Sequence, residues 1–419
     1  MSLPRLLAGV RPHAPLALAE HERIHGALRA QGPALIEAVE RAGLRGRGGA
    51  SFPAALKMAD VARRRGPRTL LVNAAEGEPM SAKDRLLIQS APQLVLDGAL
   101  AAADAVGARS IVIAVPADSE AARGVMRHAL AERPGRRRFS VVDVPAAHLA
   151  GEESALINYL GGGPLKPTLV PPRPSERGLR RRPTLVQNPE TLAHVALIAR
   201  HGPTWFRELG LAAHPGSALV TVSGAVRDQG VYEVACGTPL RSLLTAAGGG
   251  ELEPLRAALV GGYHGIWIDA DQLEAVTLDD ACLRRYGGSL GAGVVVALGK
   301  SACPVQELAR TLAWLASESA GQCGPCSNGL PALAELLAAI AAGRGGRDAR
   351  ERLDRWSGDI AERGACRLPD GAARFLRSGM GVFGAELVDH ALRGPCAGCR
   401  RLPTLQFTRG GGRRTRVAA

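Results

Sequence analysis

Short apolar runs alternate with helical stretches along the first half of the chain. Residues 68–73, 110–115 and 139–144 are short and mostly apolar, which predicts buried strands. The Ala-rich stretch 94–106 predicts a helix between the first two strands. Strand, helix and strand in succession favour a parallel α/β layer. The segment 161–189 is dense in Pro, Gly and Arg, so we expect a long and functional loop there.

The middle of the chain predicts shorter strands separated by glycine turns. The runs 218–226, 230–234 and 259–262 have the composition and length of strands, and 240–247 has the pattern of a helix. Several short strands around one helix indicate a small β-grasp-like module.

The pattern becomes helical after residue 305. Four stretches predict a helical bundle: 307–316, 330–342, 349–362 and 371–390. The last residues, from Arg400, are rich in Arg and Gly, and we expect them to be frayed. The expected organisation is an arm at 1–25, an α/β domain at 26–210, a β-grasp domain at 215–300, a helical bundle at 303–393 and a basic tail at 394–419.

Size and composition fit a globular protein of two or three domains. The 419 residues are 46% hydrophobic, and no uncharged apolar run reaches the length of about 18 residues that a transmembrane helix needs. Arg5, Arg11 and Pro12 interrupt the Leu-rich N-terminus, so we identify no signal peptide and expect a cytoplasmic protein.

The net charge of +13 comes almost entirely from arginine, since only four of the 52 basic residues are lysines. Arg clusters at 63–65, 136–138 and 180–182 lie in separate predicted loops, without the interleaved aromatic residues that nucleic-acid binding uses. We therefore expect no nucleic-acid partner, and interpret the charge as solvated surface or as a docking surface for an acidic redox partner. In a chain that uses Arg by default, a lysine such as Lys83 indicates that a slim ammonium is needed.

A glycine-rich segment, 43–57, runs into a predicted helix. Gly46, Gly48 and Gly49 leave backbone N–H groups uncovered, and Pro53 stands where a first helical turn is expected. Free N–H groups at a helix N-terminus favour a phosphate. The spacing is neither the Gly-x-Gly-x-x-Gly dinucleotide fingerprint nor the Walker pattern. By itself the segment is therefore either an anion cradle or a plain glycine-rich turn.

Three of the eight cysteines can converge. Cys323 and Cys326 form a Cys-x-x-Cys pair between the first two predicted bundle helices, and Cys366 lies between the third and fourth. Loops at the same end of an up-down bundle lie together. The spacing suits an iron–sulfur cluster, a zinc site with a further ligand, or a thiol redox pair, although a redox pair usually has a thioredoxin-like setting that is absent here.

The other five cysteines carry no clear chemistry. Cys396 and Cys399 form a second Cys-x-x-Cys pair, but one unbroken fourth helix would carry it about 30 Å from the first pair. We leave it unassigned, as a partner-supplied metal site or an exposed pair. Cys236, Cys282 and Cys303 stand alone and are interpreted as buried small hydrophobic residues.

The order of several blocks resembles the NADH-oxidising FMN flavoprotein subunit of respiratory complex I and its relatives in NAD-linked hydrogenases and formate dehydrogenases. The resembling blocks are 43–57, 73–79 with 83–85, 151–155, 165–167, 183–191, 222–224 with 237–240, and 318–326. In that family an α/β domain binds FMN, a small β-grasp domain of the SLBB type follows, and a C-terminal four-helix bundle holds a 4Fe-4S cluster. The resemblance implies the same fold class here.

The resemblance also implies roles for individual residues. Its positions for FMN and nucleotide fall on Gly46, Gly48, Gly49, Phe52, Lys57, Asn73, Gly151, Glu152, Lys166, Gln187 and Asn188. Glu78 matches the acid beside the nicotinamide and Glu153 one of a Glu pair lining the pocket, and we assign catalysis to both. The cluster ligands fall on Cys323, Cys326 and Cys366. Without the family, Asn73 would be a strand-end turn residue and Phe52 a core residue.

Five positions depart from the family pattern. Ala75 replaces an Asp, and Gln187 stands where the first of two paired asparagines is usual. Asp60 and Leu169 replace stacking phenylalanines, a loss that would weaken NADH binding by about one or two orders of magnitude. Ala320 replaces the first cluster cysteine, which implies either a 4Fe-4S cluster with a water, Ser or partner ligand or a 3Fe-4S cluster.

Three functions are compatible with these features. The leading one is an NADH dehydrogenase-like oxidoreductase that passes electrons from NAD(P)H through FMN and an iron–sulfur cluster to an iron–sulfur or ferredoxin-like partner. The chain would then be peripheral on the cytoplasmic face of a membrane redox complex. The alternative is an electron-relay or docking subunit that binds FMN and cluster but no longer oxidises NADH, which Asp60 and Leu169 favour. The third is a scaffold whose cysteines hold zinc.

Overall fold

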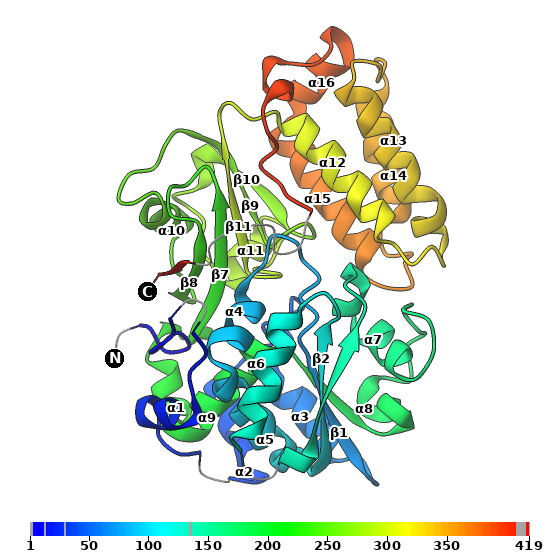
Figure 1. Cartoon of the computed structure of the whole chain (residues 1–419). Coiled ribbons are helices and arrows are strands. Elements are labelled where there is room, and N and C mark those ends of the chain that lie inside the picture. Colours follow the sequence, from blue (N-terminus) through cyan, green and yellow to red (C-terminus); the bar gives the residue numbers. More distant parts are fainter. Residues whose placement is uncertain (1–2, 12–13, 29–30, 134–135, 408–415, 419) are drawn as a thin grey trace.

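A computed structural model shows three bodies packed together (Figure 1). It describes residues 3–11, 14–28, 31–133, 136–407 and 416–418. An α/β domain forms one end of the molecule, and a β-sheet domain and a helical bundle lie side by side at the other. The predicted fold class is confirmed.

The first body is built on a four-stranded parallel sheet with the strand order β3-β2-β1-β4. Its strands are β1 (Arg68–Asn73), β2 (Ala108–Pro116), β3 (Phe139–Val144) and β4 (Thr184–Gln187). The first three strands are those predicted from the apolar runs. The fourth lies inside the segment predicted as a long loop, because a run of only four residues between Pro183 and Asn188 gives little strand signal.

Helices cover both faces of this sheet. Leu70 and Val72 pack in one hydrophobic cluster with residues of α2, α3, α5 and α9, whereas Leu71 faces the other side with residues of α7. At Gly98 a Cβ would lie 1.8 Å from the carbonyl oxygen of Leu192, so only glycine lets α5 and α9 approach this closely. The helices are α1 (Leu18–His25), α2 (Ala34–Ala42), α3 (Ala54–Ala62), α4 (Lys83–Ser90), α5 (Pro92–Val106), α6 (Glu120–Ala131), α7 (Glu153–Leu160), α8 (Pro174–Arg177) and α9 (Pro189–Arg207).

The second body is a mixed six-stranded sheet in the order β10-β9-β11-β7-β8-β12. Its elements are β7 (Ser217–Gly224), β8 (Gly230–Ala235), α10 (Leu240–Ala247), β9 (Leu255–Val260), β10 (Ile266–Asp269), α11 (Asp280–Arg285), β11 (Val294–Gly299) and β12 (Arg416–Ala418). A small hairpin, β5 (Gly210–Leu211) and β6 (His214–Pro215), precedes them. The N-terminal arm packs on this body, because the Glu233 carboxylate accepts hydrogen bonds from the backbone N–H groups of Arg5 and Leu7 at 2.8 and 3.1 Å.

The third body contains five helices where four were predicted. They are α12 (Pro304–Ser317), α13 (Leu330–Ala341), α14 (Ala349–Ile360), α15 (Leu368–Val382) and α16 (Gly384–Arg393). The predicted single helix 371–390 is broken at Phe383, whose backbone angles (φ −111°, ψ 27°) are not helical. Glycines at 379, 381 and 384 weaken the helix around this point, and the break allows α16 to take a new direction.

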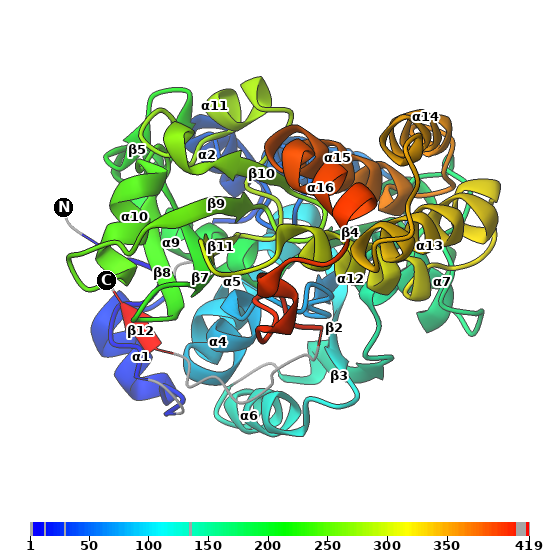
Figure 2. The same ribbon diagram turned by 90° about the horizontal axis from the view of Figure 1, so that it is seen from above.

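The prediction of a frayed C-terminus is wrong for the residues that the structure describes there. Residues 394–407, which we call the C-terminal strap, run back from the bundle across its junction with the β-sheet domain (Figure 2). Leu405 is fully buried, and the ring of Phe407 stacks on Trp314 with centroids 5.9 Å apart. Beyond them, β12 pairs in parallel with β8, while 408–415 and 419 lie outside the described residues.

By length and hydropathy, no single helix in the described part of the chain could cross a membrane. The helices α4 and α5 would meet that criterion only as a pair, and they are bent by 98° where they join.

Candidate functional site

Residues 45–53 form a closed loop between α2 and α3. The backbone N–H of Gly46 donates to the carbonyl of Phe52 at 2.8 Å, and Arg45 pairs with Pro53 as an isolated bridge. Helix α3 begins directly after Pro53, as the sequence predicts. Gly49 has a φ of +117°, which a residue with a side chain rarely adopts. The loop therefore carries exposed backbone to the N-terminus of α3, the geometry of an anion cradle.

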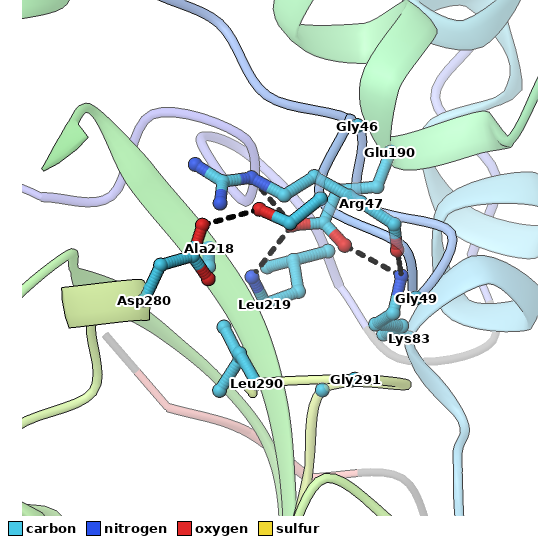
Figure 3. Close-up of a pocket in the computed structure, with 12 residues that line it drawn as sticks. Gly46, Arg47, Gly49, Lys83, Glu190, Ala218, Leu219, Asp280, Leu290 and Gly291 are labelled. Carbon is cyan, nitrogen blue, oxygen red and sulfur yellow. Dashed lines mark hydrogen bonds and ion pairs between the residues drawn. The ribbon is translucent and has the colours of Figure 1, made fainter. Parts of the chain in front are cut away.

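A buried ionic network holds this loop from behind (Figure 3). The Lys83 ammonium lies 2.6 Å from the Glu190 carboxylate and donates to the carbonyl of Arg47 at 2.9 Å. Burial alone would lower the pKa of Lys83, but the carboxylates of Asp84 and Glu190 raise it above its ordinary value. The cavity inside this network is only about 20 Å³, room for one water and far too small for a flavin. This cavity therefore does not hold the cofactor.

The outer side of the loop faces the carboxyl ends of the strands. Gly48 is exposed, and Lys57 on α3 contacts Glu153 at the start of α7, with Nζ and Oε2 2.6 Å apart. Asn73 ends β1, and its Nδ2 donates to the carbonyl of Gly151 at 3.0 Å. In open α/β sheets, ligands bind in the crevice outside the carboxyl ends of the strands. The structure thus pairs Lys57 with Glu153, and Asn73 with Gly151, beside the carboxyl end of β1.

Gln187 and Asn188 follow at the end of β4. Gln187 is buried, and its Nε2 has no hydrogen-bond partner among the described residues, so it is a donor available to a ligand acceptor. Asn188 caps α9 through Oδ1, which accepts from Thr191 N at 3.1 Å, and its Nδ2 donates to Asp84 at 3.1 Å. A Cβ on Gly48 would lie 3.6 Å from Asn188. Asn188 therefore supports the glycine loop, and its contact with flavin stays a prediction.

These features fit FMN. The exposed backbone at Gly48 and the half-buried backbone at Gly49 suit a phosphate, Lys57 supplies a cation on the helix that follows the loop, and the unpaired Nε2 of Gln187 suits a flavin carbonyl. The observation that decides the fit is the unpaired donor, because a buried amide without a partner is costly in a protein with no ligand to bind.

Glu152 and Glu78 have structural contacts as well as their predicted roles. Glu152 caps α7, since its carboxylate accepts from Ala155 N at 2.7 Å. Glu78 is buried where the α/β and β-sheet domains meet, and its Oε2 accepts from Tyr263 N at 2.9 Å. The structure therefore shows Glu78 as a link between domains, and its catalytic role stays a prediction.

The predicted nucleotide side of the crevice is more open. Phe52 is 48% exposed and Lys166 is exposed, as expected for residues that contact a ligand. Leu169, at 85% exposed, has no aromatic face to offer. Asp60 is engaged elsewhere: a hydrogen bond with Ser175 lowers the pKa of its carboxyl, and Arg63 lies 3.0 Å away. Neither Asp60 nor Leu169 therefore offers an aromatic ring that could stack on a nucleotide.

The three predicted cluster cysteines lie close enough to interact electrostatically, and their role as cluster ligands stays a prediction. Burial, together with the neighbouring thiols of Cys323 and Cys366, raises the pKa of Cys326 to about 12. Cys323 accepts a hydrogen bond from the backbone of Ala365, next to Cys366. The Ser319 side chain forms a hydrogen bond with the Cys326 thiol. Its hydroxyl is therefore close to where a fourth cluster ligand would be needed in place of the cysteine that Ala320 replaces. The set fits an iron–sulfur cluster with three thiolates and one oxygen ligand.

The cysteine loop also contacts the flavin domain. Gln322 Nε2 donates to the carbonyl of Pro167 at 2.8 Å, and His148 N donates to Glu318 at 2.7 Å. Glu152 is close enough to Cys366 to raise the pKa of its thiol, although burial is the larger cause. The FMN crevice and the cysteine cluster are therefore neighbours across one domain boundary.

Sequence reasoning missed Arg47 and Glu190. Arg47 is buried, and its guanidinium donates to Ser217 O at 2.9 Å and contacts His214 Nε2 at 3.2 Å. Both residues fix the loop from the side away from the ligand. The one available signal was the rarity of lysine, which pointed to their partner Lys83.

Comparison with known families covers each body. The family described as the Nuo51 FMN-binding domain matches residues 39–197. The SLBB domain family matches residues 219–262, and the NADH-ubiquinone oxidoreductase-F iron-sulfur binding region matches residues 306–390. These matches fall on the glycine loop, the second sheet and the cysteine cluster.

Individual relatives agree with the family matches. The chain is 34% identical to the F 2 subunit of NADH-quinone oxidoreductase from Rhizobium meliloti (strain 1021), over 85% of this chain and 88% of the relative. It is 29% identical to the F subunit of NADH-quinone oxidoreductase from Aquifex aeolicus (strain VF5), over 92% and 96%. Among solved structures, the air-oxidised NAD⁺-reducing [NiFe]-hydrogenase aligns with a TM-score of 0.80 at 32% identity, over 85% of this chain and 62% of that chain. This chain therefore belongs to the family of NADH-quinone oxidoreductase F subunits, the FMN- and iron–sulfur-binding flavoproteins.

Proposed function

We propose that this chain is an electron-input subunit that oxidises NADH at FMN and delivers single electrons, through an iron–sulfur cluster, to an iron–sulfur partner. FMN, when bound, supplies the conversion between hydride transfer and single-electron transfer. The observation that carries the proposal is the contact between the two sites, in which Gln322 of the cysteine loop bonds Pro167 of the flavin domain at 2.8 Å. Family membership supports the same chemistry.

Each predicted residue has a role that its position supports. The N–H groups of Gly48 and Gly49, with Lys57, would hold the phosphate, as would be expected for a glycine loop at a helix N-terminus. Gly46, predicted to share this role, instead closes the loop, because its N–H donates to the carbonyl of Phe52. Asn73 orients the Gly151 turn, and Gln187 would donate to the flavin ring. Glu153, fixed by Lys57, would position the nicotinamide, with Phe52 covering it and Lys166 near the dinucleotide phosphates.

The cluster would be bound by Cys323, Cys326 and Cys366, with Ser319 as the fourth ligand of a 4Fe-4S cluster. Ser319 is supported by its hydrogen bond with Cys326 and by Ala320, which has no ligand atom. The exposed residues around Cys323 would be the surface where the partner accepts electrons.

The assembly follows from these roles. We assign the α/β body to 26–210, the β-grasp SLBB domain to 215–300 and the bundle to 303–393, since most of the observed strands and helices fall within these limits. Helix α1, the hairpin of β5 and β6, and strand β12 lie outside or across them. The chain would act in the cytoplasm, attached to a membrane redox complex through its iron–sulfur partner. The relatives named as parts of NADH-quinone oxidoreductases support that placement.

A rapid-mixing experiment tests the donor. Anaerobically purified chain should contain FMN and iron, and NADH should bleach its flavin absorption, with NADPH as the matched control. If neither nucleotide bleaches the flavin while a reduced ferredoxin-type protein does, the second candidate holds, a relay subunit that does not use NADH. The lost stacking positions at Asp60 and Leu169 favour that candidate. A colourless protein that contains only zinc would contradict both.

A further inference from the structure

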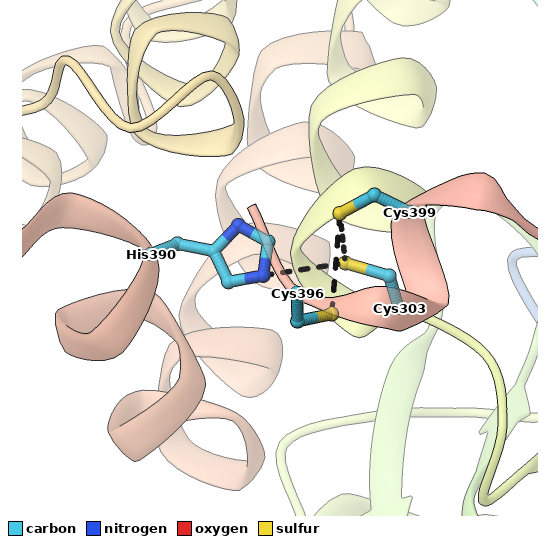
Figure 4. Close-up of side chains that lie close together, drawn as sticks. All are labelled: Cys303, His390, Cys396 and Cys399. Carbon is cyan, nitrogen blue, oxygen red and sulfur yellow. Dashed lines mark hydrogen bonds between the residues drawn. The ribbon is translucent and has the colours of Figure 1, made fainter. Parts of the chain in front are cut away.

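Four metal-ligating side chains meet beside the start of α12 (Figure 4). Cys303, His390, Cys396 and Cys399 each offer one ligand atom, and these atoms all lie within 4.8 Å of one another. Cys303 is buried in the core, as the sequence predicts, but it is not isolated, because three other possible ligands surround it. The second Cys-x-x-Cys pair, left unassigned from the sequence, has its partners within this chain.

The separations fit a single tetrahedral ion. The Sγ atoms of Cys303 and Cys399 are 3.4 Å apart, and those of Cys396 and Cys399 are 3.9 Å apart. Cys303 Sγ lies 3.6 Å from His390 Nε2. Thiolates at about 2.3 Å from a tetrahedral zinc lie about 3.8 Å from each other. The three measured distances are close to the edges of that tetrahedron.

The surrounding backbone is shaped for these ligands. Cys303 and His390 are 3% and 2% exposed, and the sulfur of Cys303 accepts a hydrogen bond from Gln306 N at 3.4 Å. Cys303 is the N-cap of α12, where free N–H groups favour a thiolate. At Gly398, a Cβ would lie only 3.0 Å from Ser301 O and Cys303 N, so the Cys-x-x-Cys turn needs glycine to approach this closely.

The break in the predicted fourth helix brings the ligands together. Helix α16 starts after Phe383 and carries His390 on its buried face. Gly394, with φ +90°, ends α16 and reverses the chain, so that Cys396 and Cys399 return to Cys303. Three segments of the chain thus deliver four ligands to one point.

We propose that Cys303, His390, Cys396 and Cys399 bind one structural zinc ion. Three thiols lose their protons on binding and the imidazole binds as the neutral ring, so the protein fills all four positions of the metal. No position remains for water or substrate, which makes the site structural rather than catalytic. A 4Fe-4S cluster fits less well. Each of its four protein ligands binds a different iron, so those ligand atoms would lie farther apart than the four atoms found here.

The zinc would fasten the C-terminal strap at the junction of the three bodies. Beyond Cys399, the backbone N–H groups of Thr404 and Leu405 donate to Glu307 on α12 at 2.6 and 3.1 Å. Gln406 then reaches both other bodies: its carbonyl accepts from the Tyr263 hydroxyl at 2.5 Å, and its N–H contacts the Met80 sulfur at 3.4 Å. The metal holds the strap where it leaves the bundle.

Metal analysis of the full-length chain, expressed with zinc and iron and purified anaerobically without chelators, tests the proposal. Wild-type chain should contain one zinc in addition to the cluster iron. The H390A variant and the C396S/C399S double variant should lose the zinc and keep most of the iron and flavin. A C323S/C326S variant should show the opposite result, loss of iron with zinc retained. Cys282→Ser, at a buried cysteine outside both groups, should keep both metals.

Native mass spectrometry of the wild-type chain tests the proposal without a variant, so its result does not depend on whether a variant folds. It should show the added mass of one zinc, and removal of that zinc should make the strap susceptible to limited proteolysis near 394–407. Zinc-free wild-type protein, a disulfide between Cys396 and Cys399, or iron in place of zinc after the C323S/C326S change would each overturn the proposal.

Discussion

Gln322 Nε2 and the carbonyl oxygen of Pro167 are 2.8 Å apart, and this hydrogen bond joins the cysteine loop to the flavin domain. A second bond, from His148 N to Glu318 at 2.7 Å, lies across the same boundary. The segment around the cluster cysteines is therefore bonded to the flavin domain at two points. These contacts favour our proposal that electrons pass from flavin to cluster within a single chain.

Removal of Lys83 should destabilise the fold and release the flavin. Its ammonium is buried between Glu190, Asp84 and the carbonyl of Arg47. Lys83→Met removes the buried ammonium from these carboxylates, and loss of one partner from a buried ion pair costs about 3–5 kcal/mol. Urea unfolding measures the effect. The matched control is Lys300→Met at an exposed lysine, and equal midpoints for the two variants would contradict the role of the network.

Gly48→Val should impair FMN binding but spare stability. A Cβ at Gly48 meets Asn188 only at an ordinary contact distance of 3.6 Å, whereas a valine would cover the backbone that faces the phosphate. We expect at least tenfold weaker FMN binding, about 1.4 kcal/mol, by fluorescence titration of the apoprotein. Gly124→Val, in open space on α6, is the control. Unchanged affinity for FMN would show that the phosphate binds elsewhere.

Ala320→Cys should restore a fourth thiolate to the cluster. Ala320 lies in the loop before Cys323, where the family has a cysteine, and Ser319 bonds Cys326 from the neighbouring position. We expect the variant to keep four irons per cluster in air for longer than the wild type, as measured by iron content and visible absorption over time. Ala320→Ser controls for the change in polarity. Identical decay of A320C and wild type would mean that residue 320 does not reach the cluster.

Acid should weaken the flavin loop through His214. Burial and the nearby Arg47 lower the pKa of His214 from 6.5 to about 4, while Asp280 opposes this shift. Between these two pH values the unfolded chain binds a proton that the folded chain does not, so stability falls as the pH drops from 6.5 to about 4. The slope reaches at most about 1.4 kcal/mol per pH unit.

The variant His214→Gln removes this titration and should lose less stability between pH 6.5 and 4.5 than the wild type. Urea unfolding at several pH values measures the difference. The other buried histidines titrate in both proteins, so they cancel in the comparison. Parallel loss of stability in the two proteins would show that His214 is already protonated in the fold or contributes nothing.

The parts of the fold with strong local patterns could be predicted. Strands β1, β2 and β3 are apolar runs, and the glycine loop before α3 carries its own signal. The strand β4 could not, because four residues beside Pro183 have no clear period. The break at Phe383 was missed because the residues on either side fit a helix, and long-range packing decides between one helix and two.

The site was predictable where motifs are local and not where contacts are distant. Cys323 and Cys326 form a local Cys-x-x-Cys motif, and the expectation that Cys366 lies near them followed from the order of the bundle helices. The fourfold group of Cys303, His390, Cys396 and Cys399 depends on the chain reversal at Gly394, which no spacing indicates. Likewise, the Arg47 guanidinium of the glycine loop donates to the carbonyl of Ser217 in the β-sheet domain. This contact between two domains could not be predicted from the sequence.

Electron transfer from flavin to cluster is tested by the redox state of the cluster after NADH is added to anaerobic protein, followed by electron paramagnetic resonance of rapidly frozen samples. We expect the reduced-cluster signal to form in the wild-type chain, and to be missing from flavin-free protein mixed with the same NADH. A bleached flavin with a cluster that stays oxidised, although dithionite reduces it, would contradict electron transfer between the two sites. So would a cluster signal of equal size in the flavin-free chain.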